Sequence, residues 1–173
     1  FKSYFLYPHT YETEYAEYRI RAITGANAKK VFSESVSQGK AYSELVRDND
    51  PIIVSFVIGE IAKSWKDDHL PILVEALNND DSVNRWGAFI TLQKNAGTRF
   101  DKIVEDLLAN NDLRKRGLAA YAVVERRDAK KFEVLQKMLS DPAELVRFDA
   151  VSALAMSGGA KGKQIIAKHR RIE

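Results

Sequence analysis

Apolar and polar residues alternate along this chain with the spacing of helices that bury one face. Between residues 50 and 80, apolar side chains stand at 57, 58 and 61 and again at 72, 73, 76 and 77, which are the i, i+3 and i+4 positions of two amphipathic helices. Turn-forming residues such as Asp67-Asp68 and Ser157-Gly158-Gly159 separate the apolar runs. The pattern therefore predicts an all-α protein. Helices are expected at residues 52–63, 69–78, 82–95, 100–109, 113–126, 129–139, 142–156 and 161–171.

The apolar pattern repeats with an offset of 31 residues. Five columns are apolar in all four copies, whereas chance at this apolar content would supply about one. These columns are Val57, Ala88, Ala119, Ala150; Ile58, Phe89, Ala120, Val151; Ile61, Leu92, Val123, Leu154; Ile72, Ile103, Val134, Ile165; and Leu73, Val104, Leu135, Ile166. The repeat predicts four helix pairs over residues 50–173 in one continuous domain.

Two Asp-Pro pairs mark expected helix starts. In Asp50-Pro51 and Asp141-Pro142 the aspartate is expected to cap the helix, with the proline at its first position. Glu144, three residues after Asp141, is expected to complete a capping box.

Residues 1–49 depart from the repeat and are expected to form a divergent N-terminal cap. A helical stripe of apolar and aromatic residues is expected to end at Gly25, with further helices at 27–37 and 40–48. The stripe is Tyr11, Tyr15, Tyr18 and Ala22. The chain begins at Phe1 rather than Met, so we expect that an upstream segment was removed or left out. Residues 1–7 are rich in aromatic side chains and are expected to form a strand or turn that packs on the first helix, and the alternative is the end of an interfacial or membrane segment.

Composition narrows the function classes. The chain has 173 residues and no cysteine, which excludes disulfides, thiolate metal sites and cysteine nucleophiles. The net charge of +3 combines −3 for residues 1–86 with +6 for residues 87–173. No apolar run approaches the roughly 20 residues that span a bilayer. We expect a cytoplasmic location, with membrane tethering through a missing N-terminal segment as the alternative.

Sequence motifs for catalysis are weak. The histidines His9, His69 and His169 lie far apart in the chain, and HExxH is absent. Residues 157–164 resemble a phosphate-binding loop, but Gln164 replaces the hydroxyl residue that would hold magnesium. Carboxylate pairs such as Asp67-Asp68 are interpreted as turn or cap residues. We therefore expect no metal, no cofactor and no catalytic residue.

The segments DDSVNRWGAFITL, NDLRKRGLAAYAV and DPAELVRFDAVSAL resemble HEAT repeats, in particular the short HEAT-like type of phycobilisome lyases. The resemblance implies a right-handed α-solenoid, or superhelix. It also implies that Arg85, Arg116 and Arg147 tie neighbouring units together rather than bind ligand. The first unit departs from the pattern, because Val54 occupies the arginine column. Tetratricopeptide and ankyrin repeats fit less well, since their periods are 34 and 33 and their signatures are absent.

Solenoids usually bind partners along the second helix of each unit. If positions 72, 73, 76 and 77 face the core, positions 75 and 78 and their equivalents face outward. The expected binding residues on this groove are Glu75, Asn78, Asp106, Lys137, Lys168 and Arg171. The charge along them changes from acidic to basic, which would orient a partner of opposite gradient.

The sequence thus predicts a monomeric, non-catalytic scaffold that binds a partner protein or peptide. One alternative is nucleic-acid binding through the basic C-terminal half, including a HEAT-like alkylpurine DNA glycosylase. For that enzyme Trp65, Asp67, Asp68 and Trp86 are the matching residue types, although the two tryptophans are interpreted first as aromatic fillers between helices. The second alternative is a bilin-lyase-like chaperone.

Overall fold

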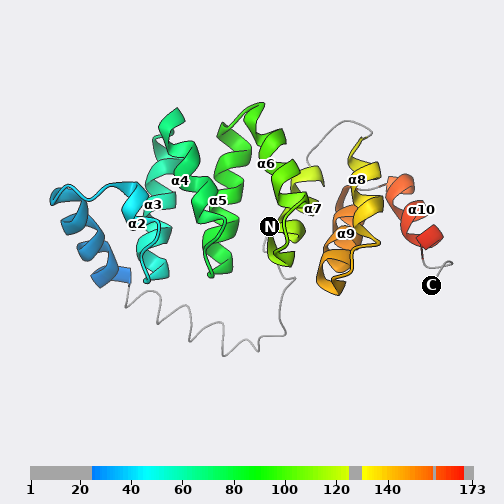
Figure 1. The fold of residues 1–173 in the computed structure, drawn as a ribbon, viewed down its shortest axis with the longest axis horizontal. Coiled ribbons are helices and arrows are strands. Elements are labelled where there is room, and N and C mark those ends of the chain that lie inside the picture. Colours follow the sequence, from blue (N-terminus) through cyan, green and yellow to red (C-terminus); the bar gives the residue numbers. More distant parts are fainter. Residues whose placement is uncertain (1–24, 125–129, 158, 170–173) are drawn as a thin grey trace. The chain divides into compact units, whose positions relative to one another are not determined.

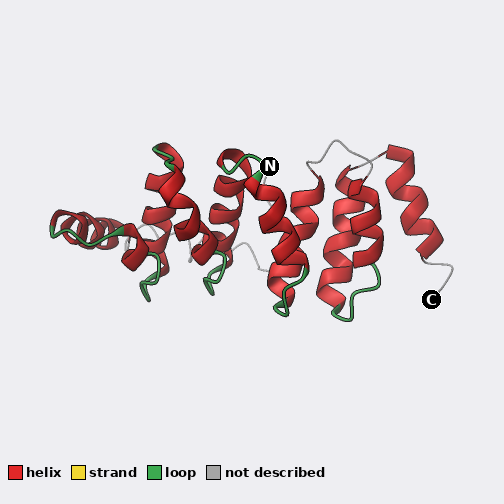
Figure 2. Ribbon diagram, turned by 45° about the horizontal axis from the view of Figure 1, so that its top comes forward, coloured by secondary structure: helices red, strands yellow, loops and turns green. Residues whose placement is uncertain are grey.

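The described part of the chain is all-helical, and it contains no strand (Figure 2). This computed structural model describes residues 25–124, 130–157 and 159–169. The predicted tyrosine stripe at residues 11–22 and the aromatic residues 1–7 lie outside these ranges, as do His9 and Arg171. None of the described helices is long and apolar enough to cross a membrane.

Two compact units divide the chain, residues 1–88 and residues 89–173. The described part of the N-terminal unit begins with a helix over residues 25–37 (Figure 1). It continues with α2 (Tyr42–Leu45), α3 (Pro51–Lys63), the 3₁₀ helix η1 (Asp67–His69), α4 (Leu70–Ala76) and the first half of α5 (Ser82–Asn95). The C-terminal unit holds the second half of α5, α6 (Arg99–Leu108), α7 (Leu113–Val124), α8 (Lys130–Met138), α9 (Glu144–Ser157) and α10 (Gly159–His169). The predicted division into a cap over residues 1–49 and four repeats over residues 50–173 in one continuous domain stays a prediction.

The helix starts follow from capping side chains. Asp50 caps α3 by accepting a hydrogen bond from the Ile52 amide at 2.9 Å, and Pro51 occupies the first helical position, as predicted. Asp81 serves α5 in the same way, accepting from the amides of Val83 at 2.9 Å and Asn84 at 3.0 Å. The helices α3, α5, α7 and α9 begin at residues 51, 82, 113 and 144, so their starts are 31 residues apart.

Most members of the predicted apolar columns are buried in the cores of the units, whereas Ile72, Val134, Val151, Ile165 and Ile166 are half-buried. Two of the columns are fully buried in all four copies, with no exposed side-chain area. They are Val57, Ala88, Ala119, Ala150 and Ile61, Leu92, Val123, Leu154. Val54, which stands in the arginine column of the first unit, is buried as well. In the C-terminal unit, α9 packs against α7, α8 and α10.

Three local predictions are wrong. The helix expected at 40–48 is only the single turn α2. Gly25 is helical, but the helix that it was expected to end lies outside the described residues. Helix α9 begins at Glu144 rather than Pro142, because Asp141 accepts a hydrogen bond from the Ala143 amide at 2.9 Å and closes a turn before the helix. The expected capping box between Asp141 and Glu144 does not form.

Candidate functional site

The described residues of each unit line a shallow hollow. The first, here called the acidic hollow, lies in the N-terminal unit between the turn that precedes α3 and the turn that follows α4, and has a volume of about 530 Å³. Four carboxylates and one arginine are its charged lining residues: Asp48, Glu75, Asp80, Asp81 and Arg47. Glu75 and Asn78, two of the predicted groove residues, both line it.

Carboxylates of the acidic hollow already hold the fold together. Oδ1 of Asp48 accepts a hydrogen bond from the amide of Asp50 at 2.8 Å, and Asp81 caps α5. Oε1 of Glu75 accepts a hydrogen bond from Nε of Arg47 at 3.1 Å, which forms an ion pair. A basic ligand would therefore have to compete with these intramolecular bonds.

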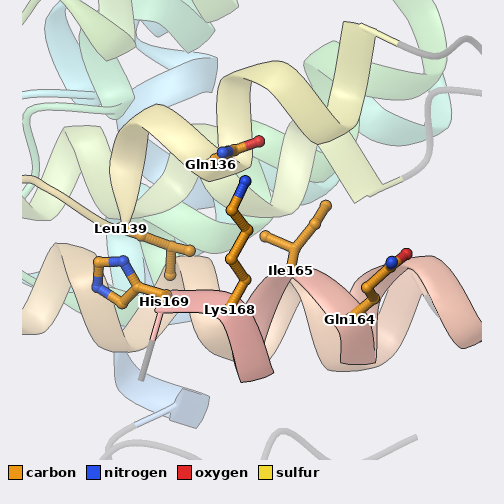
Figure 3. Close-up of a pocket in the computed structure, with 6 residues that line it drawn as sticks. All are labelled: Gln136, Leu139, Gln164, Ile165, Lys168 and His169. Carbon is orange, nitrogen blue, oxygen red and sulfur yellow. The ribbon is translucent and has the colours of Figure 1, made fainter. Parts of the chain in front are cut away.

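The second hollow, here called the basic hollow, lies between α8 and α10 in the C-terminal unit and has a volume of about 260 Å³ (Figure 3). Its lining residues are Gln136, Leu139, Gln164, Ile165, Lys168 and His169. Leu139 is buried and Ile165 half-buried, so the hollow has an aliphatic part. Figure 3 shows the Lys168 side chain extending from α10 toward Gln136 on α8. None of the lining residues is acidic.

The structure distributes the predicted groove residues over several places. Lys168 lines the basic hollow, and Lys137 is exposed on α8, directly after Gln136. Asp106 lies on α6, where it pairs with Nζ of Lys102 at 3.0 Å, and this pairing raises the pKa of Lys102. The proposed continuous gradient along these residues stays a prediction.

Arginine side chains close the turns that precede α5, α7 and α9. Nη1 of Arg85, Arg116 and Arg147 donates in each case to two backbone carbonyls, which lie five and six residues earlier in the chain. Arg116 also makes a bidentate ion pair with Asp141 in the turn before α9, at 2.8 and 2.9 Å. A hydrogen bond from Arg116 lowers the pKa of Asp141, so this pair stabilises the fold above the ordinary carboxyl pKa and is lost as the pH falls through the lowered value. Through these contacts the three arginines stabilise the turns.

The buried residue Asp149 was not identified from the sequence. Asp149 on α9 is only 6% exposed and packs against the backbone of Gly117 on α7, where a Cβ atom would collide with its Oδ2. The hydroxyl of Tyr121 donates to Oδ1 of Asp149 at 3.3 Å. Burial raises the pKa of Asp149 to about 6, although the tyrosine hydrogen bond acts in the opposite direction. Burial, followed by the charge of Asp149, raises the pKa of Tyr121 to about 12.

A sequence signal for Asp149 existed in the repeat. Its column reads Phe56, Gly87, Leu118 and Asp149, so a carboxylate stands where the other copies have apolar or small residues. A polar residue in such a column indicates either an altered surface or a buried charge. The structure shows that it is buried.

The residues considered for glycosylase chemistry lie in the N-terminal unit. Asp67 belongs to η1 with Asp68, whose side chain is 80% exposed, and Trp65 stands before η1, edge-on to His69 at 6.5 Å between ring centroids. Trp86 on α5 is 38% exposed, and its expected role as an aromatic filler between helices stays a prediction. In the described ranges, no three histidine, aspartate or glutamate side chains cluster as metal ligands. The expectation of no cofactor stays a prediction.

Comparison with protein-family models and with curated proteins found no match to this chain.

Proposed function

We propose that this chain is a HEAT-like, right-handed α-solenoid that serves as a non-catalytic scaffold for a partner protein or peptide. Three observations on the helices support the architecture. The starts of α3, α5, α7 and α9 are 31 residues apart, two core columns recur in every copy, and the turns before α5, α7 and α9 share one arginine arrangement. Recurrence of the same helix pair is what an array stacked on its neighbours requires.

The single observation that carries the function is the composition of the second helices. Each of α4, α6, α8 and α10 presents a charged side chain at the same position of the repeat, and all four are solvent-accessible. These side chains belong to Glu75, Asp106, Lys137 and Lys168. Rigid helices with accessible, charged positions are suited to bind another chain, since the scaffold loses little conformational entropy on binding.

The test is a pull-down from a lysate of the source cells, with both proteins and nucleic acids identified. We compare the wild-type chain with Lys137→Glu/Lys168→Glu and with the control Lys94→Glu/Lys163→Glu, which changes the net charge equally at exposed positions outside the column. Washing at an ionic strength of about 0.15 M screens long-range attraction between exposed charges. We expect the wild type and the control to retain the same protein and the groove variant to lose it.

Two results would contradict the scaffold. Recovery of nucleic acid alone, released steeply as salt rises, would instead identify a phosphate-binding surface, in line with the +6 charge of residues 87–173. Equal retention of the partner by all three chains would show that the second helices do not bind it.

A further inference from the structure

We propose that the basic hollow binds an acidic peptide segment, in which one carboxylate contacts Lys168 and a neighbouring aliphatic side chain packs on Ile165. The inference rests on the proposed function, because it assigns a ligand class to one place on the scaffold.

Every ionisable residue of α10 is basic. Within α10 the ionisable residues are Lys161, Lys163, Lys168 and His169, with no acidic residue among them. Lys168 has no carboxylate partner among the described residues, whereas Glu75 pairs with Arg47 and Asp106 pairs with Lys102. The acidic members of the predicted groove are thus neutralised from within, and Lys168 is not. A ligand with a carboxylate would complement that charge.

The aliphatic and amide groups of the hollow complement a peptide segment. Ile165 is half-buried, so a small apolar side chain laid on it would remove further apolar area from water, whereas Leu139 is 1% exposed and completes the aliphatic part of the hollow from within. Gln136 and Gln164 flank them, and each side-chain amide offers both a donor and an acceptor to a peptide backbone. An acidic residue next to an aliphatic residue in an extended segment presents all three complementary groups.

The same composition disfavours nucleic acid. Single strands are held by several phosphate contacts together with aromatic side chains on which bases stack. The six lining residues include no aromatic ring apart from the imidazole of His169, and Lys168 is their one lysine or arginine. We therefore assign the hollow to a peptide carboxylate rather than to a phosphate backbone.

The test is an NMR titration of the full chain, followed through its backbone amide resonances. The probe is a capped hexapeptide that alternates glutamate and leucine. Three further probes separate the causes: glutamine in place of glutamate, glycine in place of leucine, and a thymidine oligonucleotide of ten nucleotides. We expect the glutamate–leucine peptide to shift resonances of Gln136, Leu139, Ile165 and Lys168, and each single replacement to weaken binding.

A matched pair of variants tests the assignment. Lys168→Glu should weaken the glutamate–leucine peptide by about tenfold, because it replaces an attraction between exposed charges with a repulsion. Lys163→Glu makes the same charge change on the same helix outside the hollow and should have less than a twofold effect. Amide spectra of both variants report whether α10 has kept its structure.

Other outcomes overturn the inference. Equal weakening by both lysine variants would show attraction to net charge alone. Equal affinity for the glutamine peptide would remove the carboxylate from the argument, and tighter binding of the oligonucleotide at the same resonances would assign the hollow to phosphate. Absence of peptide shifts at the hollow, together with a captured partner that Lys137→Glu/Lys168→Glu does not retain, would overturn this ligand class and leave the scaffold standing.

Discussion

Replacing Asp149 by asparagine should make the protein more stable, and the gain should grow with pH. The substitution keeps the shape of the side chain and removes a charge that α7 and α9 exclude from water, since Asp149 is only 6% exposed. In the folded protein the pKa of Asp149 is raised to about 6, against an ordinary value of 3.8. The folded state therefore binds this proton more tightly than the unfolded state does, and stability falls as pH rises from below 3.8 through 6.

The raised pKa sets the size of the effect. A shift of about two pKa units corresponds to about 3 kcal/mol, which is lost almost completely by pH 7.5 and only to the extent of about 1 kcal/mol at pH 4.5. The free energy of unfolding of Asp149→Asn minus that of the wild type should therefore increase by about 2 kcal/mol between these pH values. A constant difference in packing between the amide and the acid cancels in this comparison.

The assay is urea unfolding at a series of pH values. Far-UV circular dichroism follows both units, whereas tryptophan fluorescence follows the N-terminal unit alone, because Trp65 and Trp86 both belong to it. The control Asp68→Asn removes a carboxylate that is 80% exposed and measures the effect of net charge. If the free energies of unfolding of Asp149→Asn and wild type differ by an amount that stays constant within about 0.5 kcal/mol over the whole pH range, the inference that burial raises the pKa of Asp149 is refuted.

Two further substitutions test contacts in the C-terminal unit, and urea unfolding measures both. Gly117→Ala should lower the free energy of unfolding by about 1–3 kcal/mol, because the new methyl group collides with Asp149. This loss should appear even though alanine is a better helix former than glycine. In an Asp149→Ala background the loss should vanish, and its persistence there would contradict the contact between Gly117 and Asp149. Arg116→Ala should lower the free energy of unfolding by about 2–4 kcal/mol, since Asp141 loses its bidentate partner. Arg147→Ala breaks two hydrogen bonds to backbone carbonyls and no bidentate ion pair, so it should cost about 1 kcal/mol. Equal costs for the two variants would argue against the ion pair between Arg116 and Asp141.

Most of the helices were predictable because their determinants are local. The pattern of apolar residues predicted α5 at residues 82–95 without error, and Asp50-Pro51 marked the start of α3 to within one residue. At Asp141 the same logic failed. This residue lies in the column of Asn79 and Asn110, which precede the caps by two positions, so it forms the turn rather than the first helical turn.

The candidate site was predictable only in part, because periodicity places a residue on a face but does not choose its partners. The outward position of Lys168 followed from spacing, whereas the pairing of Glu75 with Arg47 depends on how two turns approach each other. Asp149 required a further step, since its burial depends on the absence of a side chain at Gly117 in another helix. The apolar pattern of a helix does not predict which residues of a neighbouring helix it contacts.

The arginine-closed turns also bear on how the chain folds. In the turn before α5, Arg85 donates to backbone carbonyls five and six residues earlier, and Asp81 accepts from backbone amides two and three residues later. Side chains of the same short segment thus provide hydrogen-bond partners for these backbone groups. Loop-closure entropy is small for contacts over so few residues, and chains dominated by such contacts fold fast. The turns before α7 and α9 have the same arginine arrangement. Three separate short segments of the chain can therefore close early in folding, and loss of one of these turns leaves the local contacts of the other two in place.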